Sequence, residues 1–311
     1  MPVELADTTY RAKRLASRLL GPKRWSQGKA VYRRYWTEPR VRRRPVSEVE
    51  VGSFTIRAPA GHPTIDKQFD QPYRDCAVRH IARAVADAYP DASFVDIGAN
   101  IGDTAALMAS AAPNPLILVE PSDYFYELLV ENVARLPNVR RIERCLIGVD
   151  SPGQLRHWGG TAVLEPGTGD TLPTRKLAEI VDDDTRFVKI DTDGYDFAII
   201  REAAAWLAAQ QPALYYEVDC STDELLGQAD AALDALAAAG YRHFAVWDDP
   251  GFLLLATDEI DAVRQLQRYL HRVRRTAGAA QRITGLDVLA TIDRGVRDAA
   301  VDAHRNSYRK D

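Results

Sequence analysis

Short apolar segments alternate with segments of helical periodicity through the middle of the chain, and this alternation limits the possible folds more than any other feature. The unit of one strand and one helix occurs five times in succession. Such repetition is typical of a mostly parallel sheet with helices on both faces. The strand-like segments are 93–97, 116–119, 140–147, 186–190 and 212–218, and the helix-like segments are 103–112, 124–136, 176–181, 197–210 and 222–239.

Two more apolar segments, 241–247 and 251–256, follow the last of these helices. The link between them, Asp248-Asp249-Pro250, is short enough for an antiparallel hairpin. We therefore predict an α/β fold with a doubly wound, mostly parallel, seven-stranded sheet that ends in an antiparallel edge hairpin. In this fold class, ligands bind beyond the carboxyl ends of the strands, where the strand order reverses.

The two ends of the chain differ in character from its centre. We predict a basic N-terminal arm or cap at 1–70, the main α/β domain at 71–260 and a C-terminal helical extension at 261–311. Residues 1–50 hold 13 Lys and Arg against 5 acidic residues, whereas the whole chain carries −4. The arm could contact a phosphate-bearing molecule or the surface of an anionic membrane, or it could simply be solvated. The overall negative charge argues against a nucleic-acid partner.

Composition excludes several other classes of protein. With 46% hydrophobic and 27% charged residues, the chain suits a soluble globular protein. Cys76, Cys145 and Cys220 are too few and too scattered for a disulfide framework or a metal site, so we predict no metal and a cytoplasmic enzyme. No apolar run reaches the roughly 18 residues of a membrane span, and we expect no signal peptide. The oligomeric state is left open.

The turn after the first strand is the first candidate binding element. It reads Asp96-Ile97-Gly98-Ala99-Asn100-Ile101-Gly102-Asp103. Gly98 and Gly102 allow a tight turn and a close approach of a ligand to the backbone, and Asp96 ends the strand with an acceptor. The turn is neither the GxGxxG fingerprint of dinucleotide-binding folds nor a P-loop. An ordinary strand-to-helix corner is the alternative.

Acidic residues follow three other strands. Glu120, before Pro121, comes after the second strand, where a carboxylate can accept both hydroxyls of a ribose. Lys189, Asp191 and Asp193 end the fourth strand, and Glu217 ends the fifth. A carboxylate there could take a proton from a hydroxyl, hold a cation or position a ligand's amino group. The alternative for this cluster is a buried structural ion pair with Lys189.

Together these segments resemble the FkbM family of O-methyltransferases, which use S-adenosylmethionine (SAM). The resemblance lies in the segments 94–104, 119–121, 188–196 and 212–217. The block Lys189-Ile190-Asp191-Thr192-Asp193-Gly194 resembles a subgroup associated with glycan biosynthesis. The chain differs from the commonest family pattern by having Asp193 and Asp196 where glutamate is more usual.

The resemblance implies a class I SAM methyltransferase fold and a role for each matching residue. The methyl group would pass directly to a hydroxyl of a sugar, a glycan or a glycosylated small molecule, with a lipid-linked or nucleotide-linked glycan as the expected partner. At the methionine end of SAM, the implied residues are Asp96, Gly98, Asn100 and Gly102, with the neighbouring Asp103. Glu120 with Pro121 would hold the ribose, and Leu146 or Ile147 would flank the adenine. Lys189, Asp191 and Asp193, supported by Glu217, would face the methyl group and the acceptor.

The base that would take the proton of the acceptor hydroxyl is not fixed by the sequence. Asp191 or Asp193 is the first candidate, and His157, in the long loop before the fourth strand, is the second. His62 is a weaker candidate, since a lone loop histidine is more often exposed. A nucleotide-linked oxidoreductase would need a third glycine where Asn100 stands. The other alternative is a non-catalytic module that binds a glycosyltransferase.

Overall fold

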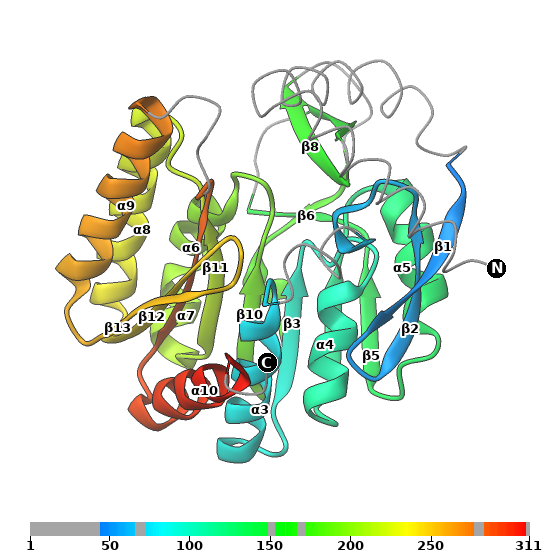
Figure 1. Ribbon diagram of the computed structural model, residues 1–311, viewed down its shortest axis with the longest axis horizontal. Coiled ribbons are helices and arrows are strands. Elements are labelled where there is room, and N and C mark those ends of the chain that lie inside the picture. The colour runs from blue at the N-terminus through cyan, green and yellow to red at the C-terminus, as the bar shows by residue number, and fades with distance from the viewer. Residues whose placement is uncertain are drawn as a thin grey trace.

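The computed structural model describes residues 44–65, 73–148, 153–158, 160–166, 172–276 and 283–308. Residues 1–43, which contain most of the basic arm, lie outside this part of the chain. The described residues form an eight-stranded sheet with the strand order β13-β12-β14-β11-β10-β3-β4-β5 (Figure 1). The order reverses between β3 and β10, so this is the switch point at which a doubly wound sheet binds its ligand. The predicted fold class is confirmed.

The sheet is parallel except at β13 and β14. Most of its strands are buried, as expected for a sheet covered on both faces. Their bounds are β3 Ser93–Ile97, β4 Leu116–Val119, β5 Val139–Glu143, β10 Thr185–Ile190, β11 Ala213–Val218, β12 His243–Asp248, β13 Leu253–Thr257 and β14 Leu286–Thr291.

Helices cover both faces of the sheet. One face packs against α3, α4, α5 and α10, with the β1–β2 hairpin outside α4 and α5, and the other packs against α6 to α9. No helix in the described part of the chain has the length and apolar character needed to cross a membrane. The bounds are β1 Val46–Val51, β2 Phe54–Pro59, α3 Cys76–Ala88, α4 Asp103–Ala111, α5 Asp123–Val133, α6 Asp196–Glu202, α7 Ala204–Gln210, α8 Asp223–Ala238, α9 Ile260–Thr276 and α10 Arg294–Ser307.

The structure corrects the sequence prediction in three places. The segment 261–311 is not only helical, because its strand β14 pairs antiparallel with both β11 and β12 and raises the strand number from seven to eight. The strand predicted at 140–147 is two strands, since β6 (Leu146–Ile147) leaves the sheet and pairs with β9 (Thr174–Arg175). The helix predicted at 197–210 is divided at Ala203 into α6 and α7.

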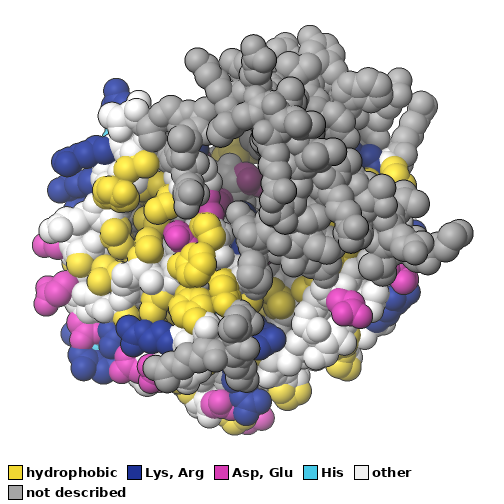
Figure 2. Space-filling model, in the orientation of Figure 1, with side chains coloured by type: hydrophobic (Ala, Val, Ile, Leu, Met, Phe, Trp, Pro, Cys, Tyr) yellow, Lys and Arg dark blue, Asp and Glu magenta, His cyan; other side chains and the backbone are white. Residues whose placement is uncertain are grey.

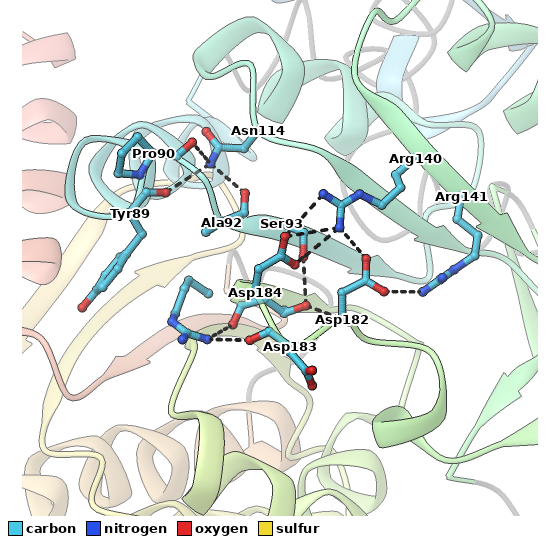
Figure 3. Close-up of polar contacts among 12 residues, drawn as sticks. Tyr89, Pro90, Ala92, Ser93, Asn114, Arg140, Arg141, Asp182, Asp183 and Asp184 are labelled. Atoms are coloured by element: carbon cyan, nitrogen blue, oxygen red, sulfur yellow. Dashed lines mark hydrogen bonds and ion pairs between the residues drawn. The ribbon is translucent and has the colours of Figure 1, made fainter.

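Hydrogen bonds and ion pairs connect the loops at the edge of the sheet where the strands begin (Figure 3). The amide of Asn114 donates to three backbone carbonyls in the turn that leads into β3, over distances of 2.8 to 3.3 Å. The hydroxyl of Ser93 donates to Asp184 over 2.7 Å, and the guanidinium of Arg140 pairs with Asp182 and Asp184. The network joins β3, β5 and β10 and pairs the charges of Arg140 and the two aspartates, while Oδ1 of Asn114 is buried without a hydrogen-bond partner among the described residues.

The opposite edge, where the strands end, carries two small additional sheets. The hairpin of β7 (Gly153–Trp158) and β8 (Thr161–Pro166) stands above this edge, with β6 below it (Figure 1). The short 3₁₀ helix Leu177–Glu179 leads from β9 towards β10. These elements cover the switch point between β3 and β10 and enclose a cavity there.

Candidate active site

A cavity of about 610 Å³ lies at the carboxyl ends of β3, β4, β10 and β11. This volume is within the roughly 300–1,000 Å³ typical of small-molecule sites. The β7–β8 turn and residues 62–63 form its cover, and Cys145, Leu146, Ile147 and Leu164 contribute an apolar wall. In Figure 2, acidic and hydrophobic side chains are visible together along the margin of the residues drawn in grey.

The turn after β3 passes unusually close to the end of β10. Gly98 has φ +80°, and a Cβ there would lie 1.9 Å from the backbone oxygen of Asp191. Only glycine fits this contact, because both the backbone conformation and the space exclude a side chain. The amides of Gly98 and Ala99 donate to the carbonyl of Val119 over 3.0 and 2.9 Å. The turn is therefore held between β4 and β10 at the floor of the cavity.

Asn100 connects this turn to the cover of the cavity. It adopts a left-handed conformation with φ +50°. Its side-chain amide donates to the carbonyl of Gly160 over 2.8 Å, and its Oδ1 lies 3.1 Å from Nε2 of His62. Thr64 contacts the other ring nitrogen of His62 and donates to Asp103 at the start of α4. His62 is buried and lines the cavity, contrary to the exposure expected of a loop histidine.

The carboxylate of Glu120 is fixed at the end of β4 by backbone amides. One oxygen accepts from the amide of Asn100 over 2.9 Å, and the other accepts from the amide of Ser122 over 2.8 Å. Burial raises the pKa of Glu120 to about 7. Each oxygen keeps a further lone pair, so the group can still accept hydrogen bonds from a ligand in the cavity.

Lys189 is held between two carboxylates at the end of β10. Its Nζ lies 3.1 Å from Asp96 and 3.4 Å from Asp191. Burial opposes the charge, but the two carboxylates outweigh it and raise the pKa of Lys189. Lys189 is therefore a cation and not a base. Asp96 is fully buried beneath the cavity, whereas the side chain of Asp191 is 46% exposed and lines it.

Two further acids follow in the same loop. Asp193 has φ +51° and accepts a hydrogen bond from Thr161 at the tip of the β7–β8 hairpin. Burial, together with the nearby charge of Asp191, raises the pKa of Asp193 to about 6. Asp196 is buried at the start of α6, where it accepts from the amide and hydroxyl of Thr192. A carboxyl with a pKa near neutrality is suited to exchanging a proton with a bound molecule.

The structure brings together most of the residues predicted from sequence. Eleven of them line the cavity: Gly98, Asn100, Asp103, Glu120, Pro121, Leu146, Ile147, Lys189, Asp191, Asp193 and Glu217. Asp96 lies beneath the floor, where it holds Lys189. Gly102 is the N-cap of α4 and packs towards α5.

His157 lies outside the lining of the cavity. Its Nε2 is 2.8 Å from the hydroxyl of Ser122, the residue that caps α5, and its ring packs edge-on against Tyr124 and Phe125. These contacts attach the β7–β8 hairpin to the start of α5. In this position the histidine supports the cover of the cavity and does not face its interior.

Sequence reasoning missed a group of polar residues at the end of the cavity near β11. They come from four segments that flank the predicted motifs: the turn before α3, the β12–β13 turn, the end of α9, and β14 with the residues just before it. No local pattern marks them, because they converge only when β14 inserts between β11 and β12. The residues are Arg74, Asp75, Asp249, Arg274, Thr284 and Asp287.

Comparison with protein families gives one match, to the methyltransferase FkbM domain, over residues 96–243. The match begins at Asp96 and includes the glycine turn, Glu120, the Lys189 to Asp196 loop and Glu217. It spans somewhat less than half of the chain and omits the flanking residues around Arg74 and Asp287. Comparison with curated proteins gives no match.

Among solved structures, the methyltransferase FkbM from Methylobacillus flagellatus is similar over 64% of this chain, with 14% identity and a TM-score of 0.35. The chain spans 43% of the length of that protein. The plantazolicin methyltransferase BamL is similar over 73% of this chain and 88% of its own, with 11% identity and a TM-score of 0.41. An O-methyltransferase from Bacillus cereus is similar over 68% and 80% of the two chains, with 10% identity and a TM-score of 0.38.

Proposed function

We propose that the chain is a SAM-dependent O-methyltransferase that acts on a hydroxyl of a sugar, a glycan or a glycosylated small molecule. The observation that carries the proposal is the meeting of three elements in one cavity at the switch point. These are the glycine turn after β3, the carboxylate of Glu120 and the Asp96–Lys189–Asp191 chain. The match to the FkbM domain covers all three.

The residues present fit SAM. Glu120 can accept from the ribose hydroxyls, because its two oxygens are fixed by backbone amides and keep lone pairs towards the cavity. Leu146 and Ile147 offer an apolar wall to the adenine. Gly98 and Asn100 would lie at the methionine end. When bound, SAM supplies a methyl group activated by its positively charged sulfur.

The protein's own contribution is to position the acceptor and to take its proton. Asp191 is exposed to the cavity at the end of β10, and Asp193, with its pKa near 6, lies in the same loop. Either carboxylate can accept the proton of the acceptor hydroxyl, a step worth about 10²–10⁴-fold in rate. Lys189 keeps Asp191 oriented. The cover formed by residues 62–63 and the β7–β8 turn limits the access of water.

The direct test is methyl transfer from SAM with a labelled methyl group to a panel of possible acceptors. The panel contains free sugars, nucleotide-linked sugars, lipid-linked glycans and glycosylated metabolites, with a peptide and an RNA for comparison. We expect label on a carbohydrate oxygen, located by mass spectrometry after hydrolysis. Label on the peptide or the RNA in place of the sugars would contradict the proposed substrate class.

A further inference from the structure

Two carboxyl groups face each other where the cavity meets β11 and β14. Glu217 on β11 and Asp287 on β14 are direct partners in the antiparallel register of these strands, so their side chains lie on the same face of the sheet. Both line the cavity. Like charges placed directly opposite each other destabilise a sheet. The charge of Arg74 offsets part of this repulsion at Asp287, so the arrangement is unfavourable mainly at Glu217.

Glu217 differs from the other acids that line the cavity. Asp219 pairs with Arg274 over 2.7 Å, Asp249 accepts from Thr284 and Gly285, and Asp287 accepts from the hydroxyl of Tyr215. No described residue donates a hydrogen bond to the carboxyl of Glu217 or forms an ion pair with it. Burial and the surrounding acids Asp191, Asp196 and Asp287 raise the pKa of Glu217 well above its ordinary value.

A carboxyl in the wall of the cavity that has no donor from the described residues indicates what a ligand there must supply. Glu217 is half-buried, and a ligand that fills the cavity and excludes water from it has to offer a donor, because a polar group left unmatched on burial is costly. Burial, followed by the charges of Asp75 and Asp191, raises the pKa of Asp287 to about 8. A neutral hydroxyl would donate one hydrogen bond but would leave the repulsion between the acids in place. A protonated amine has three donors and no acceptor, and its positive charge would add to those of Arg74, Lys189 and Arg274 in a part of the cavity where acids outnumber cations.

We propose that Glu217 and Asp287 bind a protonated amine of the acceptor, so that the substrate is an amino sugar or an amino-sugar-containing glycoside. This inference rests on the proposed function and specifies its substrate class. A divalent cation is disfavoured, because the described residues contain no group of three His, Cys, Asp or Glu side chains that could hold one.

The position of the pair relative to Asp191 supports an amine close to the reacting hydroxyl. Strands β10 and β11 are parallel neighbours, with Ile190 opposite Tyr216, so Asp191 and Glu217 are the next residues along each strand. The hydroxyl at Asp191 and the amine at Glu217 would then lie on neighbouring positions of one small molecule. Asp287 lies outside the segment that matches the FkbM domain, which is expected of a residue that determines specificity.

The test compares three sugars that differ in one group. The full chain, saturated with S-adenosylhomocysteine (SAH), is titrated at pH 7 with D-glucosamine, D-glucose and N-acetyl-D-glucosamine, and each Kd is measured by NMR. We expect glucosamine to bind about tenfold or more tightly than the other two, the scale of a charged hydrogen bond. Equal affinities, or no binding of glucosamine, would overturn the inference. Binding of calcium chloride in place of the amine would also overturn it.

Glu217→Gln provides the matched variant. It keeps the shape of the side chain and removes one of the two facing acids, so we expect the ligand-free protein to melt at a higher temperature. The preference for glucosamine should fall to about twofold or less, while the affinity for SAH stays unchanged. Glu259→Gln, at an exposed position, should alter neither quantity. A preference that survives Glu217→Gln would overturn the inference.

If the protein is not a SAM-dependent methyltransferase, the first step of this experiment shows it, because SAH then does not bind the wild-type protein. The same three sugars are in that case titrated into the free protein. A preference for glucosamine that depends on Glu217 would then still support the amine site, and its absence would overturn it.

Discussion

The two edges of the main sheet use the same types of residue in opposite ways. At the edge where the strands begin, Arg140 lies among Asp182 and Asp184, and Asn114 donates to carbonyls that need a donor. At the edge where the strands end, acids face other acids. Burial and neighbouring charge raise the pKa of Asp193 to about 6 and that of Asp287 to about 8.

This difference separates what stabilises the fold from what prepares it for a ligand. At the beginning edge the charges are already paired within the protein, so a bound molecule would find no unpaired charge there, and we expect this edge to contribute to stability. A carboxyl without a partner, such as that of Glu217, is unfavourable in the free protein and becomes favourable when a ligand supplies the missing partner. Perturbed pKa values cluster at functional sites for this reason. The substitutions below test the contrast, starting with the largest expected effect.

Asp191→Asn should abolish most of the turnover and change stability little. The substitution removes a carboxylate from the reacting centre, so kcat should fall about 10²–10⁴-fold. The side chain is 46% exposed, and Lys189 keeps its ion pair with Asp96 over 3.1 Å, so the melting temperature should stay close to that of the wild type. Transfer of a labelled methyl group and a thermal melt measure the two effects. Asp183→Asn, exposed at the other edge, is the control, and a destabilised but fully active Asp191→Asn variant would refute the catalytic role.

Lys189→Met should destabilise the protein by about 3–5 kcal/mol, because it leaves the fully buried Asp96 without its partner. The double variant Asp96→Asn with Lys189→Met should recover part of this loss, since no uncompensated charge remains. Unfolding in urea measures both. Lys176→Met, at an exposed site, should change the free energy of unfolding by less than about 0.5 kcal/mol. Equal stability of the two single lysine variants would contradict the proposed buried ion pair.

The ligand-free protein should become more stable as the pH falls from 8 to 6.5. The pKa values of Glu120 and Asp196 rise to about 7 on folding, and that of Asp287 to about 8, because all three are buried. The folded state therefore binds more protons than the unfolded state in this range, and stability is lost as the pH rises through these values. A net uptake of about one proton corresponds to about 2 kcal/mol, or a rise in Tm of about 4 °C.

His80 limits the pH range over which stability should rise. Burial lowers the pKa of His80 to about 4, so the unfolded state binds a proton that the folded state does not, and this lowers stability as the pH falls below the ordinary histidine pKa of 6.5. The trend should therefore weaken below pH 6.5. Asp287→Asn should flatten the rise between pH 8 and 6.5. A Tm that increases with pH across this interval would show that the acids at the ending edge are not buried as described.

Arg140→Ala should have the smallest effect. Its side chain is 38% exposed, and ion pairs of this kind contribute about 0–1 kcal/mol. We expect a fall in the free energy of unfolding within that range and no change in kcat or in the Km for either substrate. A clear loss of activity with retained stability would mean that the two edges are not functionally separate.

The sequence predicted the parts of the molecule that are encoded locally. The glycine turn, Glu120 and the Lys189 to Asp193 loop each lie directly after a strand, so the strand pattern and the rule for doubly wound sheets were sufficient to place them together. Asp96 and Lys189 were both predicted at the site, but their ion pair depends on the register of β3 against β10, which the sequence does not show.

The remaining features depend on pairing between distant segments. The apolar run at Leu286–Ala290 is too short to distinguish a strand from a helix by periodicity. Only its insertion between β11 and β12 places Asp287 opposite Glu217. The positions of His62 and His157 also depend on contacts between distant segments, and the sequence predicted neither of them correctly. His62 was expected to be exposed but is buried at Asn100, whereas His157, offered as a base, contacts Ser122 outside the cavity.

The most direct test of the central claim is calorimetric titration of the full chain with SAH and, separately, with NAD. We predict that SAH binds at one site per chain and that NAD does not bind. Glu120→Ala should weaken SAH binding by about 1.5–3 kcal/mol, or roughly 10- to 150-fold, which is the scale of a lost charged hydrogen bond. The exposed Glu202→Ala variant should bind SAH like the wild type. Binding of NAD in place of SAH, or an SAH affinity that Glu120→Ala leaves unchanged in a folded protein, would contradict the account.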